Sequence, residues 1–261
     1  MAFKTGLSAC IITLNEENAI EQCIQSLSFA DEIILFDSYS KDKTCSIARS
    51  LGAKVFRHTF DNYVNQKNRC LKKAKYSWIL SIDADEVLSK NLQHEIQTVV
   101  RSGDSKNGYK IPRMTFYLNR WIKRSGWYPD YSMRLVRNGY GYFKGDTVHE
   151  KLTVDGETGK LKYPMLHYSY NSISEHLDRI NLYSSLIAKE KYKNGQHPSV
   201  LWAFCKSISK FFLTYFWKMG FLDGKAGFVI AVFGAFYNFQ KYIKVWEMNL
   251  KNIQKNRNLH H

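Results

Sequence analysis

Short apolar runs alternate with amphipathic segments through the first hundred residues of the chain. The runs are too short for buried helices and predict buried strands at 7–12, 33–36, 54–57 and 77–82. The segments between and after them place apolar residues three and four positions apart, which predicts helices near 16–27, 42–51, 63–74 and 89–99. This alternation predicts an α/β fold with a mostly parallel, doubly wound sheet.

Polar side chains gather where three of the predicted strands end. They are Thr13, Asn15 and Glu16 after the first strand, Asp37, Ser38, Ser40 and Asp42 after the second, and Asp83, Asp85 and Glu86 after the fourth. The carboxyl ends of parallel strands meet at one edge of a sheet, and ligands bind at that edge. A single cluster indicates only a loop, or a helix start such as the capping-box spacing of Thr13 and Glu16. Three clusters on one edge predict a binding site.

The motifs that are missing narrow what this site holds. The first turn, TLNEEN, contains no glycine, so it is not a dinucleotide-binding turn, and the chain has no P-loop. A divalent cation is then the remaining way to hold a nucleotide diphosphate, because hard cations bridge carboxylate and phosphate oxygens. Asp83 and Asp85 suit that role: in an extended segment they lie roughly 6.5–7 Å apart on one side of the chain. Taken alone, the same residues are equally typical of a helix start, and Glu86 is expected to be only a first-turn helix acid.

Three consecutive segments carry a likeness to a known family. They read ACIITLNEEN, EIILFDSYSKDKT and NQKNRCLKKAKYSWILSIDADE, and they resemble family 2 glycosyltransferases of the GT-A fold over roughly residues 5 to 170. Further on, WYPDYSMRLVRNG and DTVHEKL are similar to lipopolysaccharide inner-core heptose β-1,4-glucosyltransferases of Gram-negative bacteria. The resemblance implies transfer of a hexose, glucose in the narrower match, from a UDP-sugar to an inner-core sugar, heptose in that match.

The resemblance also implies roles for residues at the strand ends. Thr13, Asn15 and Glu16 would line the nucleotide pocket, Asp37 would bond the uracil ring with Ser38 and Asp42 nearby, and Lys67 and Asn68 would contact the base or the diphosphate. Asp83 would meet the ribose and the metal, and Asp85 would be the main ligand of Mn²⁺ or Mg²⁺. Family members often have proline at the position of Thr13, which changes little where the backbone makes the contact.

The family inverts the anomeric centre, so a carboxylate must take the proton of the acceptor hydroxyl. Asp130, in WYPDYSMRL, and Glu150, in TVHEKL, are the two candidates, and Glu150 is slightly preferred. The structural alternatives are a turn residue after Pro129 for Asp130 and a first-turn helix acid for Glu150.

Several other side chains are candidates for binding sugar or phosphate. Arg113, Arg134 and Arg137 have the forked guanidinium that suits phosphate, with a solvated basic face as the alternative, which is favoured for Arg137 but not for Arg134. Trp127 and Tyr128 are suited to stack on a sugar ring or to pack in the core. His167 is expected to be a structural histidine, with a place near the diphosphate as the weaker alternative.

The last sixty residues differ in composition from the rest. From 200 to 261, aromatic residues alternate with lysines, and nine basic residues face two acidic ones. Such a pattern is typical of helices that lie on an anionic membrane. The longest apolar stretch, 226–239, is shorter than the roughly 20 residues that span a bilayer. We therefore expect a catalytic domain over 1–175 and a helical region over 176–261 that attaches the protein to the cytoplasmic face of the inner membrane; a helical lid or a dimer interface is the alternative.

The net charge of +15 and the five cysteines leave two other function classes to weigh. A basic, aromatic-rich chain also suits nucleic-acid binding. However, the strand-end edge carries acids and no recognition helix is evident, so we expect no nucleic-acid partner. A transferase that acts on polyprenyl phosphate would share the same donor site and tail. The cysteines lack metal-ligand spacing and predict reduced, buried thiols. The oligomeric state is not predicted.

Overall fold

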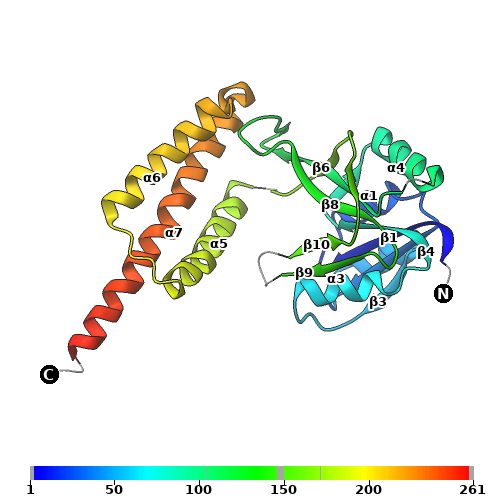
Figure 1. The fold of residues 1–261 in the computed structure, drawn as a ribbon, viewed down its shortest axis with the longest axis horizontal. Coiled ribbons are helices and arrows are strands. Elements are labelled where there is room, and N and C mark those ends of the chain that lie inside the picture. The colour runs from blue at the N-terminus through cyan, green and yellow to red at the C-terminus, as the bar shows by residue number, and fades with distance from the viewer. Residues whose placement is uncertain (1–2, 104, 146–149, 171, 259–261) are drawn as a thin grey trace. The chain divides into compact units, whose positions relative to one another are not determined.

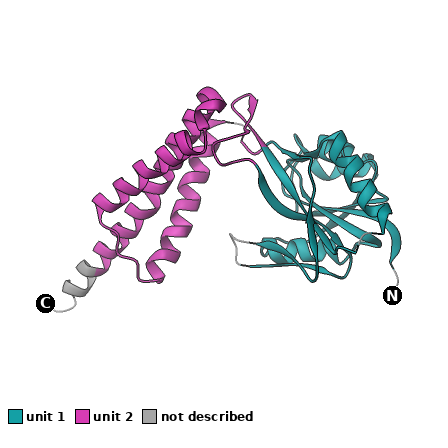
Figure 2. Cartoon of the chain, turned by 45° about the horizontal axis from the view of Figure 1, so that its top comes forward, with its two compact units in different colours: residues 1–114, 129–168 teal, residues 115–128, 169–261 magenta. Residues whose placement is uncertain are grey.

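The computed structural model describes residues 3–103, 105–145, 150–170 and 172–258 (Figure 1). The chain forms two compact units (Figure 2): unit 1 comprises Met1–Met114 and Pro129–Tyr168, and unit 2 comprises Thr115–Tyr128 and Ser169–His261. The division into folding domains predicted from the sequence, 1–175 and 176–261, stays a prediction; its boundary falls near the start of the first long helix of unit 2.

Unit 1 is built on a sheet whose centre is parallel. The four predicted strands are present as β1 (Lys4–Thr13), β2 (Glu32–Asp37), β3 (Lys54–Arg57) and β4 (Tyr76–Asp83). They lie side by side in the order β3-β2-β1-β4, all parallel. The sheet continues through β8 (Asp130–Arg137), which is antiparallel to β4, and through β6 (Gly108–Tyr117), β12 (Met165–His167) and β5 (Glu86–Leu88).

Helices cover both faces of this sheet, because alternate residues of each buried strand point to opposite sides. Leu7, Ala9 and Ile11 of β1 pack in a core with apolar residues of α1 (Ile20–Gln25), α2 (Thr44–Ser50) and α4 (Lys90–Ser102). Cys10 packs on the other face with α3 (Tyr63–Leu71) and the hairpin of β9 (Gly141–Lys144) and β10 (Lys151–Val154). The predicted doubly wound α/β fold is therefore confirmed, and four of the five cysteines are buried free thiols.

Two local predictions in unit 1 are wrong. Thr13 and Glu16 do not form a capping box: Thr13 is the last residue of β1, and α1 begins at Ile20 with no side-chain cap. Glu86 is not a first-turn helix acid, because it begins the short strand β5 and pairs with His167 across the antiparallel β5–β12 ladder. The helix starts later, at Lys90, with the side chain of Ser89 accepting the N–H of Leu92 as predicted.

Unit 2 is helical, with α5 (Ile173–Lys193), α6 (Val200–Phe212) and α7 (Gly224–Asn258), and α7 packs against both others. A π-helical turn at Leu213–Trp217 and a 3₁₀ turn at Gly220–Asp223 join α6 to α7. The short segment 115–128 belongs to this unit and contains β7 (Arg120–Trp121). The carboxylate of Asp223 anchors it by accepting the N–H groups of Lys123 and Arg124 and the hydroxyl of Ser125.

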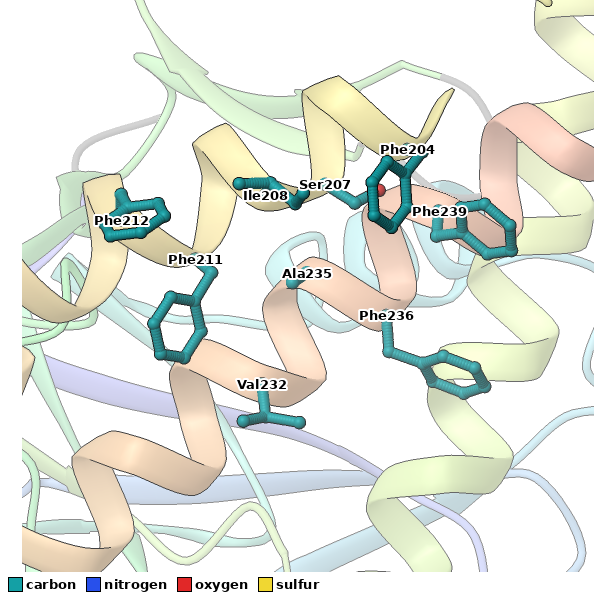
Figure 3. A pocket seen from close by; sticks show the side chains of 9 residues that line it. All are labelled: Phe204, Ser207, Ile208, Phe211, Phe212, Val232, Ala235, Phe236 and Phe239. Carbon is teal, nitrogen blue, oxygen red and sulfur yellow. The ribbon is translucent and has the colours of Figure 1, made fainter. Parts of the chain in front are cut away.

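Much of the apolar surface of unit 2 is exposed. Trp217 is 83% exposed and Leu201 is 71% exposed, and phenylalanines of α6 and α7 are about half exposed. Phe204, Phe211 and Phe212 of α6, with Phe236 and Phe239 of α7, line an open apolar groove of about 610 Å³ (Figure 3). By length and composition alone the helical stretch Gly220–Asn252 could cross a membrane, and 33% of its most apolar window is buried within the protein. The sequence prediction considered only the uninterrupted apolar stretch, which ends at Phe239, whereas the helical stretch described here continues to Asn252.

Candidate active site

The three predicted polar clusters lie together at the carboxyl edge of the parallel strands. Thr13 is the register partner of Asp37 on β2, and Ile12 is the partner of Asp83 on β4. Three adjacent strands therefore end at the same level, and the segments that follow them line one edge. The sequence prediction that these clusters meet is confirmed.

Asp37 is a fully buried acid of this edge. Its carboxylate accepts the backbone N–H and the hydroxyl of Ser40, and it lies 3.4 Å from Nε of Arg57. The same Ser40 hydroxyl oxygen accepts the N–H of Asn15 at 2.8 Å, and Asn15 has a left-handed backbone with a φ of 56°. These bonds connect the loop after β1 to the loop after β2, so the two predicted nucleotide-pocket segments form one wall.

A second set of bonds continues this wall. Glu16 donates its N–H to the hydroxyl of Thr44 at 2.8 Å, and Asp42 accepts the N–H of Thr44 at 3.0 Å. Burial opposes ionisation of Asp42, but the hydrogen bonds that its carboxylate accepts from Thr44 and from the N–H of Glu17 outweigh burial and lower the pKa of the carboxyl group. The loop is thus held by charge-assisted bonds to backbone N–H groups.

Two buried side-chain oxygens of the edge have no hydrogen-bond partner within the described part of the chain. They are Oγ1 of Thr13 and Oε1 of Gln66, whose Nε2 donates to the hydroxyl of Ser38 at 3.2 Å. An unpaired buried polar atom costs roughly 1–3 kcal/mol. A bound ligand that forms hydrogen bonds with these two oxygens would remove this cost. Gln66 was not a sequence candidate, although it lies beside Lys67 in the same motif.

Asp83 is held by two buried cations. Its carboxylate lies 3.1 Å from Nζ of Lys67 and 3.0 Å from a guanidinium nitrogen of Arg134. Burial alone would raise the pKa of Asp83, but the two cations reverse this and lower it far below its usual range. Lys67 also lies 3.5 Å from Glu150, so one ammonium group joins the predicted ribose residue to the preferred base. Residues 146–149 of the same motif lie outside the described residues.

Glu86 contacts both Asp83 and Arg134. The side chain is fully buried, and it accepts the guanidinium of Arg134 at 2.7 Å and the N–H of Asp83 at 2.9 Å. Burial raises the pKa of Glu86, while the charge of Arg134 counteracts the rise. Glu86 therefore positions both Arg134 and the backbone of Asp83.

Asp85 lies beside His167, for which the sequence pattern favoured a structural role. Oδ2 of Asp85 lies 3.1 Å from Nε2 of His167, the last residue of β12. The other ring nitrogen of His167, Nδ1, is buried and has no partner among the residues that the structure describes. Two ligands of an octahedral ion with bonds near 2.1 Å lie roughly 3 Å apart, so this oxygen and nitrogen are spaced to share one ion. The described residues contain no group of three or more His, Cys, Asp and Glu side chains that could hold a metal, so the remaining ligands would come from substrate or water.

Comparison with known proteins decides the family. The family model described as glycosyl transferase family 2 matches residues 8–148, which include the three polar strand ends but not Glu150 or His167. The chain belongs to glycosyltransferase family 2.

Relatives of this glycosyltransferase match it along nearly its whole length. A glycosyltransferase of Rickettsia bellii is 35% identical, over 94% of this chain and 87% of that protein. The lipopolysaccharide core biosynthesis glycosyltransferase LpsC of Rhizobium meliloti is 28% identical, over 97% of this chain and 96% of that protein. Among solved structures, TarS of S. aureus aligns over 94% of the chain with a TM-score of 0.48 and 15% identity. Glucosyl-3-phosphoglycerate synthase of Mycobacterium tuberculosis aligns over 44% with a TM-score of 0.36 and 24% identity.

As predicted, unit 1 has the GT-A fold, and the protein is a sugar-transferring enzyme. The remaining candidates of this glycosyltransferase lie at different distances from the cluster. Asp130, at the start of β8, is exposed and accepts two hydrogen bonds from Arg113, whose guanidinium lies 3.8 Å from Glu86. Asn68 uses both ends of its amide on the backbone of Phe143, which anchors β9 to α3; its predicted contact with the donor stays a prediction.

The other aromatic and arginine candidates pack within their own units. Arg137 lies over the ring of Trp78 at 4.9 Å rather than on an open basic face. Trp127 belongs to unit 2 and packs with Tyr117 and Tyr170. The structure thus joins Lys67, Asp83 and Glu150 through ion pairs, and Arg137 is not part of that group.

Proposed function

We propose that this glycosyltransferase moves a hexose, glucose in the narrower resemblance, from a UDP-sugar to a saccharide of the lipopolysaccharide core, with heptose as the expected acceptor unit. The main support for this proposal is that three polar strand ends lie at one edge of the sheet, where Asp85 and His167 are spaced to share an ion. The full-length similarity to LpsC supports the acceptor class. A transferase acting on polyprenyl phosphate is the alternative that shares this donor site.

The donor would lie along the wall formed by the first two strand ends. Asp37 is proposed to bond the uracil, with Thr13, Asn15, Glu16 and Ser38 lining the pocket. The unpaired oxygen of Thr13 supports this placement, because a ligand group would satisfy it.

The cation would be Mn²⁺ or Mg²⁺, held by Asp85 and His167, with Asp83 beside them. When bound, such an ion offsets the charge that develops on the leaving diphosphate. Lys67 and Arg134 keep Asp83 ionised and place two further positive charges near it. We propose that they stabilise the diphosphate electrostatically as it leaves.

Glu150 is proposed as the base. Its carboxylate would accept the proton of the acceptor hydroxyl while that oxygen forms the bond to C1 and the bond from C1 to the diphosphate breaks. Its contact with Lys67 ties it to the same cluster as Asp83, whereas Asp130 reaches that cluster only through Arg113. Asp130 remains the second candidate.

The test measures UDP release by the purified full chain from a panel of UDP-sugars with Mn²⁺ and a lipid A–core acceptor. Asp85→Asn and Glu150→Gln are each expected to lower turnover by about a hundredfold or more. The exposed Glu21→Gln, on α1, serves as the matched charge control and is expected to keep full turnover. Activity with polyprenyl phosphate but not with core saccharide would refute the acceptor, and full activity of Asp85→Asn would refute the metal site.

Unit 2 is proposed to attach the enzyme to the inner, cytoplasmic face of an anionic inner membrane. The support is the exposed apolar surface of α6 and the turns after it, the phenylalanine groove of Figure 3, and nine basic against two acidic residues from 200 onward. Exposed rings and lysines on one helical unit suit the interface between acyl chains and anionic headgroups.

Flotation with phosphatidylglycerol vesicles tests this attachment. The double variant Leu201→Ser, Trp217→Ser is expected to lose flotation, while the double variant Tyr140→Ser, Tyr142→Ser, which removes two exposed aromatic side chains of unit 1, keeps it. Release by alkaline carbonate distinguishes a peripheral protein from one whose helix crosses the bilayer. A stable dimer that does not float would show that a second copy covers this surface and would refute the membrane proposal.

A further inference from the structure

Unit 2 contains a second cavity whose lining differs from that of the apolar groove. It measures about 290 Å³ and lies among α5, α6, α7 and the segment that carries Trp127. Aromatic rings and basic side chains share its walls, including Trp127, Tyr170, His176, Arg179 and Lys210. Mixed aromatic and polar linings are typical of small-ligand sites, and this volume is close to the lower end of their range.

Two aromatic side chains, Trp127 and Tyr170, line part of the cavity and are together called the aromatic shelf. Their ring centres lie 5.9 Å apart, and their planes are inclined by 31°. The imidazole of His176 packs against both, 4.4 Å from Tyr170 and 6.0 Å from Trp127. Aromatic side chains suit the C–H face of a sugar ring, and their polar atoms suit its hydroxyl groups.

His176 presents a hydrogen-bond donor to this site. Burial, with the nearby charge of Arg179, lowers the pKa of His176 to about 4, so the imidazole is neutral. Its Nδ1 lies 2.8 Å from the hydroxyl of Tyr117, and burial raises the pKa of that hydroxyl to about 12. In the tautomer that carries the ring proton on Nε2, the Tyr117 hydroxyl donates to Nδ1, and Nε2–H has no acceptor among the described residues.

Two basic side chains, Lys210 and Arg179, line the cavity. The ammonium of Lys210 makes no hydrogen bond or ion pair with any described residue, and burial, with Lys218 nearby, lowers its pKa. The guanidinium of Arg179 lies 5.0 Å from the ring centre of Tyr170 and binds Glu175 at 2.7 Å. Glu175 pairs with Arg179, and the described residues offer Lys210 no carboxylate, which favours an anion in the cavity.

We propose that this cavity binds one sugar unit bearing a phosphate or carboxylate group. The ring lies on the shelf of Trp127 and Tyr170, the anionic group meets Lys210 and Arg179, and Nε2–H of His176 donates to the sugar. The volume fits a single unit rather than an oligosaccharide. All of these residues belong to unit 2, whereas the proposed donor, metal and base residues belong to unit 1. It would give the enzyme selectivity for a charged saccharide.

Isothermal titration of the full-length protein tests the proposal with glucose 6-phosphate as the probe, and with glucose and inorganic phosphate as comparators. Glucose 6-phosphate is expected to bind at least tenfold more tightly than either comparator, since only it meets both the shelf and the cations. Lys210→Ala is expected to weaken binding by about tenfold or more, because it removes a charge-assisted contact. Lys206→Ala, which makes the same charge change one turn earlier on α6, is expected to bind like the wild type; Lys206 lies over Trp202, away from the cavity lining.

A second variant tests the cavity without changing charge. Gly234 lines the cavity, and an added Cβ there would lie 3.7 Å from Cε of Lys210, an ordinary contact. Gly234→Leu is therefore expected to fill the cavity and abolish binding while circular dichroism stays unchanged. The proposal is overturned if glucose 6-phosphate does not bind, if inorganic phosphate binds equally well, or if Lys206→Ala loses as much affinity as Lys210→Ala.

Discussion

Arg134→Met tests whether the buried ion cluster holds the candidate site together. Methionine keeps most of the volume of the arginine stem but removes the charge that bridges Asp83 and Glu86. Breaking a buried pair by removing one partner costs about 3–5 kcal/mol. The low end applies here, because Asp83 keeps Lys67 at 3.1 Å and Glu86 keeps the N–H of Asp83 at 2.9 Å. We therefore expect a loss of about 3 kcal/mol, which lowers the melting temperature by about 6–12 °C for a chain of this size.

The pH dependence makes this prediction specific. Burial raises the pKa of Glu86 in the folded state, so its contribution to stability is full below the unfolded pKa and is lost as pH rises through the folded pKa. Removing Arg134 raises the folded pKa further. The deficit of the variant is therefore expected to shrink when the pH is lowered from about 7.5 to about 5.

Urea denaturation followed by circular dichroism measures both effects, with three proteins besides the wild type. Adding Glu86→Gln to Arg134→Met is expected to restore part of the stability, because the glutamine oxygen still accepts the N–H of Asp83 and carries no charge. Arg69→Met, which breaks the exposed pair with Asp61, is expected to change the midpoint little. A deficit that is the same at both pH values, or no larger than that of Arg69→Met, would refute the account of the cluster.

Two further predictions concern the ion site and the helical unit. In the wild type, UDP with Mn²⁺ is expected to raise the melting temperature by about 5–10 °C at a hundredfold excess over Kd, and Asp85→Asn and His167→Ala should each lose most of this shift in differential scanning fluorimetry. Equal shifts with and without Mn²⁺ would contradict the ion site. Gly227→Ala is expected to lower the melting temperature by several degrees, because its Cβ would lie 1.8 Å from the carbonyl oxygen of Gly220. Gly234→Ala, on the same helix α7, is the control and should not lower the melting temperature. Similar melting temperatures for the two alanine variants would show that α7 and the 3₁₀ turn do not pack as closely as described.

The sequence predicted the parts of the fold that depend on local periodicity. Buried parallel strands give continuous apolar runs, and the polar residues after Ile12, Phe36 and Ile82 mark where the runs end. Because parallel strands must end at one edge, linear positions were sufficient to bring Thr13, Asp37 and Asp83 together. The capping-box error at Thr13 arose because the same polar residues suit a helix start and a ligand-binding loop.

What the pattern could not predict depends on contacts between distant parts of the chain. The three-residue strand β5 is too short to show a period, and its place depends on pairing with β12 almost eighty residues later. Similarly, the segment 115–128 belongs to unit 2 because Asp223 binds its backbone, about a hundred residues away. Neither link leaves a local signal in the sequence.

The three neighbouring acids at the end of β4 differ in the groups that surround them. Asp83, Asp85 and Glu86 lie within four positions, yet their partners are two cations, a histidine, and a guanidinium with a backbone N–H, respectively. Of the three acids, Asp85 is the one whose described partner is a histidine nitrogen, a common metal ligand, rather than Lys67 or Arg134. A carboxylate already neutralised by Lys67 and Arg134 attracts an ion less strongly than one that is not. The division of roles that we propose for Asp83 and Asp85 therefore follows from where Arg134 and Lys67 lie, and exchanging those cations for neutral residues should shift metal preference towards Asp83.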